Sequence, residues 1–189
     1  MSFIEILNTE VLSNEKSLLE KITYRKAGEP DEHVRVVFTR PDATAILLYD
    51  PNRKTVLLTE QDRLPVYLKE KSNAQILEVC AGLIDEGELP EHTVIREVEE
   101  ETGYRISHIK KVGESYSSPG AFSEYLHYFV GEYSPDLKIA EGGGLEHEGE
   151  DIKLVELSFE EARDLLKQGK IRDAKTLLLL QYAALNNII

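Results

Sequence analysis

The sequence predicts an α+β fold in which mixed sheets are covered by helices and preceded by a β-rich N-terminal region. Three observations lead to this prediction. Strand-like runs come first, one helix follows, strands return and two helices end the sequence, unlike the regular alternation of a doubly wound parallel sheet. The 189 residues are about one domain in length. Apolar residues make up 41% of them, which is enough for a sizeable core.

The first 40 residues read as short strands. The expected strands are Ile4–Val11, Leu18–Lys26 and His33–Thr39, with a turn at Ala27–Pro30. Such a region has too few apolar positions for its own core, and its sheet edges invite pairing. We therefore expect it to pack on the rest of the chain or on a second copy. The expected division is a β-rich region at residues 1–41 and a main domain at residues 42–189.

The main domain is expected to alternate strands and loops around its helices. Further strands are expected at Ala43–Tyr49, Thr55–Gln61, Gln75–Ala81, Ile106–Ser117, Tyr125–Tyr133 and Ile152–Leu157. Gly82 is expected to end the third of these. The polar stretch Leu64–Ala74 and the glycine- and acid-rich stretch Ser134–Asp151 are expected to be loops.

Three helices are indicated by their end signals. Pro90 suits the first turn and Gly103 a left-handed C-terminal cap, which predicts a helix over Pro90–Thr102. The residues Ser158–Glu161 form a capping box that opens a helix ending at Gly169. Asp173 caps the final helix, whose Leu177–Leu185 stretch is expected to be largely buried.

Composition excludes several classes of partner. Lys and Arg number 22 against 35 Asp and Glu, a formal net charge of −13, so a nucleic acid would be repelled. No apolar run approaches the ~20 residues needed to span a bilayer, and no signal peptide is visible. The single cysteine, Cys80, excludes an intramolecular disulfide and a multi-cysteine zinc site. These observations predict a cytoplasmic protein with neither a membrane nor a nucleic-acid partner.

Three carboxylates crowd one edge of the first expected helix. Glu97, Glu100 and Glu101 stand at i, i+3 and i+4, and so fall on one arc. The neighbouring arc is apolar and should face the core, through Val94, Ile95 and Val98. One interpretation is a solvated acidic face. The other is a site for Mg²⁺ or Mn²⁺, which would relieve the repulsion between like charges and prefers oxygen ligands.

The segment from Gly82 to Tyr104 resembles the Nudix box. The family pattern is Gly, five residues, Glu, seven residues, Arg-Glu, an apolar residue, any residue, Glu-Glu, any residue, Gly and an apolar residue. Seven fixed identities recur here at that spacing: Gly82, Glu88, Arg96, Glu97, Glu100, Glu101 and Gly103. The resemblance implies an α/β/α sandwich that uses Mg²⁺ or Mn²⁺ to hydrolyse nucleoside diphosphates linked to another moiety.

The same resemblance implies a role for each box residue. Glu97 and Glu101 would be the main metal carboxylates, with Glu100 assisting and the Ala81 carbonyl as a further ligand. Arg96 would hold Glu88 or Glu100 in place. The family takes its general base from a flexible loop, for which the candidates are Glu146, Glu148 and Glu150. Of these we favour Glu150, as base or extra metal ligand, and then Glu148.

Segments outside the box are similar to the branch that contains ADP-ribose pyrophosphatases and GDP-mannose hydrolases. They are Glu60–Arg63, Leu77–Gly82 and Ser117–Gly120, with Gly142–Gly144, Glu150–Ile152 and Gly169–Thr176 most similar to the bacterial GDP-mannose hydrolases. The resemblance implies a homodimer whose β-rich N-terminal regions exchange between subunits. It also implies substrate contacts at Arg35, Arg63, Gly82, Leu83, Glu124 and Lys175. Glu78 is either an outward strand residue or a further contact.

Three functions remain open from the sequence. The leading hypothesis is hydrolysis of a nucleoside diphosphate sugar, with GDP-mannose giving GMP and mannose 1-phosphate. The alternative is ADP-ribose hydrolysis, which would give AMP and ribose 5-phosphate. A non-catalytic sensor of nucleotide sugars on the same fold is disfavoured, because every box carboxylate is present and we expect no DNA-binding domain in addition.

Overall fold

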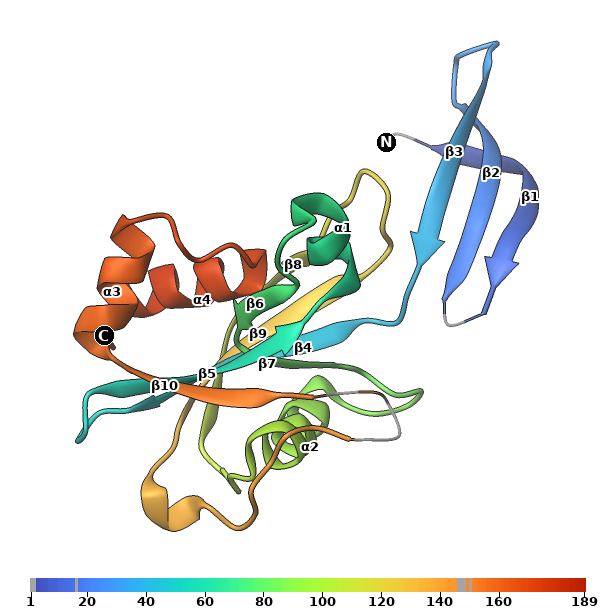
Figure 1. Ribbon diagram of the computed structural model, residues 1–189. Coiled ribbons are helices and arrows are strands. Elements are labelled where there is room, and N and C mark those ends of the chain that lie inside the picture. Colours follow the sequence, from blue (N-terminus) through green and yellow to red (C-terminus); the bar gives the residue numbers. More distant parts are fainter. Residues whose placement is uncertain (1–2, 16, 146–148, 150) are drawn as a thin grey trace. The chain divides into compact units, whose positions relative to one another are not determined.

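The structure, a computed structural model of the chain, describes residues 3–15, 17–145, 149 and 151–189 (Figure 1). The chain forms two compact units. Unit 1 contains the described residues up to Asp42 together with Glu114–Leu126. Unit 2 contains Ala43–Gly113 and His127–Ile189.

Unit 1 is built on a three-stranded antiparallel sheet. Its strands are β1 (Ile4–Asn14), β2 (Leu18–Lys26) and β3 (Glu32–Thr39), in the order β1-β2-β3. The three strands predicted for this region are therefore confirmed, and β1 extends three residues beyond its predicted end. Gly28 adopts a φ of 84° in the turn between β2 and β3, where its missing side chain removes the steric penalty.

A segment far along the sequence completes unit 1. The Phe38 N–H donates to the Ala121 carbonyl at 2.8 Å, and the Ser123 N–H donates to the Phe38 carbonyl at 3.2 Å. The rings of Phe38 and Phe122 meet edge to face, 5.4 Å apart. The sequence did not indicate this addition, because residues some 80 positions apart meet without leaving a local pattern.

Unit 2 contains most of the main sheet, whose strand order is β10-β5-β4-β9-β8. Strand β6 pairs with β5, and β7 pairs with β4. The bounds are β4 Ala43–Asp50, β5 Thr55–Asp62, β6 Gln75–Glu78, β7 Cys80–Leu83, β8 Ile109–Tyr116, β9 Tyr125–Glu132 and β10 Lys153–Ser158. A short 3₁₀ turn, η1, covers Pro135–Leu137 within the predicted loop.

Helices cover both faces of this sheet. Figure 1 shows α2 (Pro90–Thr102) on one side, and α3 (Phe159–Lys167) with α4 (Ala174–Leu185) on the other. Strand β4 lies between these layers and is buried almost throughout, so it contributes to both sides. The core beneath α2 joins the strands to the helix through Ile46, Leu48, Val94, Val98, Phe129 and Tyr133. The predicted α+β sandwich is confirmed.

Two local predictions before the box are wrong. Leu64–Ala74 was expected to be a loop, but Leu64–Glu70 forms the helix α1, which ends at Lys71 in the left-handed conformation. None of its residues is buried, so the sequence carries no amphipathic signal there. The single strand predicted for Gln75–Ala81 is two strands with different partners, and β7 runs through Gly82 to Leu83 instead of stopping.

The predicted end signals of the other helices are confirmed. Gly103 caps α2 with a φ of 72°, Ser158 forms a complete capping box on α3, and Asp173 caps α4. The predicted burial of the last helix is wrong in part: Leu179 and Leu180 are buried, but Leu185 is 84% exposed. The leucines of this stretch are distributed around the whole helix, whereas only one face of the helix packs against the rest of unit 2. Across the described residues, none of the helices has the length and apolar character needed to cross a membrane.

Candidate active site

Helix α2 carries the glutamates of the box, and its packing decides which way they face. Val94 and Val98 are fully buried and Ile95 packs on the same cluster, as predicted. This apolar stripe fixes the rotation of the helix about its axis. Glu97 and Glu100 consequently lie half-buried at one edge, and Glu101 is almost completely buried. The three carboxylates thus share one edge of the helix.

Gly82 permits a close approach between β7 and α2. A Cβ atom at this position would lie 1.9 Å from the Glu97 carboxyl carbon and 2.0 Å from its Oε1. The Glu97 carboxylate therefore rests directly against the strand backbone next to Ala81. Gly82 has no positive φ, so this close approach, and not a left-handed conformation, is what requires a glycine here.

Arg96 connects the loop before α2 to the helix itself. Its guanidinium donates to Glu88 Oε2 at 3.2 Å and to Glu97 Oε1 and Glu100 Oε2 at 2.9 Å each. Both partners expected from the sequence are therefore present, and Glu97 is a third. The hydrogen bond from Arg96 lowers the pKa of the Glu88 carboxyl, and the bond to Glu88 raises the pKa of Arg96 despite partial burial. Arg96 stays charged and holds the three carboxylates together.

The donors at this edge fit a hard divalent cation. Within the described ranges, no three aspartate, glutamate, histidine or cysteine side chains lie close enough together to form a complete metal site. However, Glu97, Glu101 and the backbone of Ala81 supply oxygen atoms, the ligands that Mg²⁺ and Mn²⁺ prefer. The missing side chain of Gly82 brings one of these carboxylates onto the strand. The residue types and this close approach are compatible with a Mg²⁺ site completed by further ligands.

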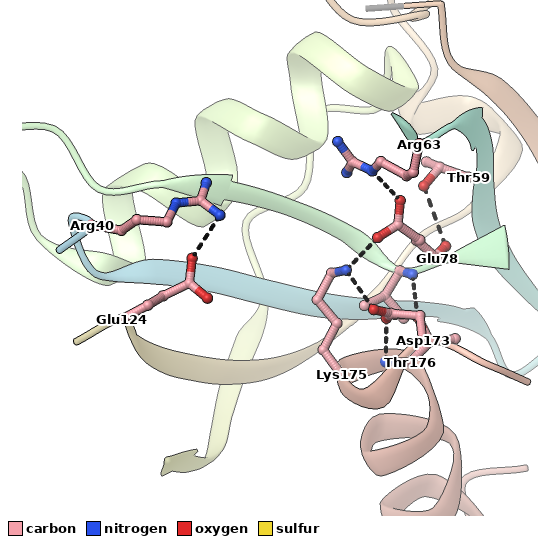
Figure 2. A network of polar contacts seen from close by, with 9 residues as sticks. Arg40, Thr59, Arg63, Glu78, Glu124, Asp173, Lys175 and Thr176 are labelled. Atoms are coloured by element: carbon pink, nitrogen blue, oxygen red, sulfur yellow. Dashed lines mark hydrogen bonds and ion pairs between the residues drawn. The ribbon is translucent and has the colours of Figure 1, made fainter. Parts of the chain in front are cut away.

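A second polar cluster lies where β6 meets the start of α4 (Figure 2). Arg63 Nε donates to Glu78 Oε2 at 2.8 Å, and Lys175 Nζ donates to the other oxygen of Glu78. Lys175 also donates to Asp173 Oδ1 at 2.9 Å. Glu78 is only 5% exposed, which excludes the first of its two predicted roles, that of a strand residue pointing into solvent. It brings together two of the predicted substrate contacts, Arg63 and Lys175.

The start of α4 is tied to the strand that leads into the box. The Thr176 N–H and hydroxyl donate to Asp173 Oδ2 at 2.9 and 2.6 Å, and the Val79 N–H donates to Thr176 Oγ1 at 2.8 Å. Sequence reasoning found the Asp173 cap but missed Thr176 as a contact of the strand. The partners are 97 residues apart, so no local signal could have found this contact.

The other predicted site residues are distributed between the units. Leu83 is partly exposed at the end of β7 in unit 2. In unit 1, Arg35 is exposed and donates to the Val34 carbonyl at 2.9 Å. Glu124, also in unit 1, pairs with Arg40 at 3.4 Å, a partner that the sequence did not indicate (Figure 2). The three candidates for the general base, Glu146, Glu148 and Glu150, lie outside the described residues.

A sheet between helical layers, with an arginine-linked glutamate cluster on α2, is the arrangement of the family that the box suggested. The NUDIX domain model matches residues 39–180, which is most of the chain, and the chain belongs to this family. It is 40% identical to the GDP-mannose pyrophosphatase of Escherichia coli O157:H7 and 41% identical to that of Cronobacter sakazakii (strain ATCC BAA-894). Each comparison covers 98% of this chain and 97% of the relative.

Among solved structures, the fold matches that of an ADP compounds hydrolase. The TM-score is 0.74, and the match covers 98% of this chain and 97% of the other. The two sequences are 19% identical, so this likeness concerns the fold. It confirms the predicted sandwich.

Proposed function

We propose that this protein hydrolyses the diphosphate bond of a nucleoside diphosphate sugar, with GDP-mannose as the preferred substrate and GMP and mannose 1-phosphate as products. The observation that carries the proposal is the ordered box, in which Arg96 holds Glu88, Glu97 and Glu100 together on and beside α2. The similarity to GDP-mannose pyrophosphatases over 98% of the chain supports this choice of substrate.

The glutamate edge of α2 is the proposed metal site. Glu97 and Glu101, with the Ala81 carbonyl, would hold Mg²⁺ or Mn²⁺, and Glu100 would assist. When bound, the cation supplies positive charge to the diphosphate oxygens, polarises phosphorus and lowers the pKa of an attacking water. An acidic protein, with a net charge of −13, needs this added charge to bind an anionic substrate.

The remaining roles belong to the chain's own side chains. Arg96 keeps the box carboxylates in position by ion pairs with Glu88, Glu97 and Glu100. A loop glutamate, Glu150 or else Glu148, would accept the proton of the attacking water. The proposed substrate contacts are Arg35, Arg63, Gly82, Leu83, Glu124 and Lys175.

We also propose that the chain forms a homodimer by exchange of its N-terminal region. The sheet of unit 1 exposes large apolar side chains at Phe3, Ile4, Ile6, Val11, Leu12, Val34 and Val36. The described part of unit 1 contains no helix that covers them. Exposed apolar surface of this kind is typical of an interaction site, and exchange of an element between identical chains is a low-cost route to a symmetric dimer.

A substrate panel tests the proposed activity. The purified chain would be incubated with Mg²⁺ and GDP-mannose, ADP-ribose, ADP-mannose or GDP-glucose in parallel, and kcat/KM determined for each. We expect the largest value for GDP-mannose. A clear preference for ADP-ribose would replace the proposed substrate by the alternative. If none of the compounds were cleaved, the proposed hydrolase activity would be wrong.

A further inference from the structure

One buried carboxylate serves two cations in unit 2. Each oxygen of Glu78 accepts a hydrogen bond from a different positive side chain, Oε2 from Arg63 and Oε1 from Lys175 (Figure 2). The side chain of Glu78 is 6% exposed, that of Lys175 is 15% exposed and that of Arg63 is 43% exposed. The buried acid therefore lies beneath a more open arginine, and it fixes the spacing between the two cationic groups.

Both cations retain donors that the cluster does not use. Arg63 binds Glu78 through Nε, and its terminal nitrogens point away from that carboxylate in Figure 2. Among the described residues these nitrogens make no hydrogen bond. Lys175 gives two bonds, to Glu78 and Asp173, and an ammonium group has three N–H donors. The unused donors suit the oxygens of a phosphate group.

Lys175 is held both in place and in its charged form. Burial would lower the pKa of its ammonium group, but the carboxylates of Glu78 and Asp173 outweigh this effect, and its pKa is raised. Asp173 is itself fixed as the N-cap of α4 by the N–H and hydroxyl of Thr176. Stability alone does not explain such a cluster, because a buried ion pair adds little compared with apolar packing of similar volume.

The cluster lies close to the box along the chain. Glu78 ends β6 and precedes Ala81 of β7 by three residues, so their backbones are at most about 10 Å apart. This separation is shorter than a nucleoside diphosphate sugar. An anion held at the metal site proposed beside Ala81 would thus extend within reach of groups near Glu78.

From this arrangement we infer that Glu78 is a positioning residue, which orients Arg63 and Lys175 as a fixed pair for the phosphate-bearing part of the substrate. The inference rests on the proposed function for the class of ligand. Glu78 need not touch the substrate. Its two oxygens hold the cations in the arrangement that binds an anion, so that less side-chain freedom is lost when the ligand arrives.

Positioning and simple charge predict opposite results for one substitution. Glu78→Gln removes a negative charge beside two positive groups, so if only net charge mattered, an anion would bind more tightly. If Glu78 positions the cations, the same change frees them and binding becomes weaker. Glu78→Asp gives a second test at unchanged charge, because it withdraws the carboxylate by about 1.5 Å.

The experiment measures the Kd of GDP, in the presence of Mg²⁺, by isothermal titration calorimetry. For both Glu78 variants we expect Kd to rise on the order of tenfold, the size expected when one charge-assisted hydrogen bond is misplaced. In an Arg63→Ala background, Glu78→Gln should have a clearly smaller effect, because one of its two partners is gone. The matched control is Glu156→Gln on β10, which breaks the ion pair of Glu156 with Arg53 and should leave Kd unchanged.

The outcomes separate this inference from the proposed activity. GDP binding does not depend on hydrolysis, so failure to cleave GDP-mannose would refute the activity and leave the binding test readable. An unchanged or lower Kd in folded Glu78 variants would overturn the inference. Full additivity with Arg63→Ala, or no binding of GDP by the wild-type chain, would overturn it too. If Glu78→Gln does not fold, Glu78→Asp decides the question.

Discussion

Substituting alanine for Gly82 is expected to disable the site while leaving the fold intact. The new Cβ would lie 1.9 Å from the Glu97 carboxyl carbon, whereas ordinary contacts begin at 3.4 Å. The carboxyl group would have to move by 3.4 − 1.9, or about 1.5 Å, and would lose its 2.9 Å bond from Arg96. Displacements of about 1 Å in an active site can cost about 10²-fold in rate. We therefore expect kcat for GDP-mannose to fall by at least about 10²-fold.

The control for this substitution is Gly113→Ala. Among the described residues nothing lies within 4 Å of a Cβ atom at Gly113, and its φ is not positive. The assay compares kcat of both variants and the wild type across a Mg²⁺ titration, with thermal unfolding followed by circular dichroism. We expect both variants to melt within a few degrees of the wild type. If Gly82→Ala kept near-normal turnover at saturating Mg²⁺, the close approach of Glu97 to β7 would not matter for catalysis.

Three further predictions address the metal, the buried lysine and the dimer. Glu101→Gln keeps the size of the side chain but removes its charge, so kcat should fall by at least about 10²-fold with an unchanged far-UV spectrum; near-normal turnover would refute its role as a metal ligand. Because the pKa of Lys175 is raised above its ordinary 10.5, its ion pairs should stabilise the fold fully below that pH and be lost as the pH rises through the higher folded value. The Tm difference between wild type and Lys175→Met should therefore stay constant from about pH 6 to 9.5 and shrink above it; a loss of the difference near neutrality would contradict this. Deletion of residues 1–40 should abolish the dimer and weaken substrate binding, as measured by light scattering after size exclusion and by KM; a fully active monomer would contradict the proposed exchange.

The parts of the fold that the sequence predicted are those with local signals. Pro90 and Gly103 mark the two ends of α2, and the periodicity of Val94 and Val98 fixes its buried side. Ser158 and Asp173 likewise mark helix starts through their own side chains. In each case the residues that carry the signal lie within a few positions of the structure they determine.

The parts that the sequence missed depend on tertiary contacts. Helix α1 has no buried residue to give it a periodic pattern, and the change of partner between β6 and β7 follows from where β5 and β4 lie. The bond that joins Glu78 to Lys175 spans 97 residues. Arg63 and Lys175 were named by resemblance, but the carboxylate between them became visible only once the chain was folded.

The box residues were predicted together because their spacing is a property of the sequence. Arg96 pairs with Glu88 and Glu100 as expected, since both lie within reach of its long side chain. Its bond to the adjacent Glu97 was not expected. The roles of Glu146, Glu148 and Glu150 stay predictions, because these residues lie outside the described part of the chain.

The proposed chemistry as a whole is tested most directly by the products formed from GDP-mannose. The purified chain would be incubated with GDP-mannose and Mg²⁺, and the reaction followed by ³¹P NMR with and without an excess of EDTA. We predict that the two diphosphate resonances are replaced by two monophosphate resonances, those of GMP and mannose 1-phosphate, and that EDTA prevents the change. Persistence of the diphosphate resonances with Mg²⁺ present, or an equal rate with EDTA, would contradict the account.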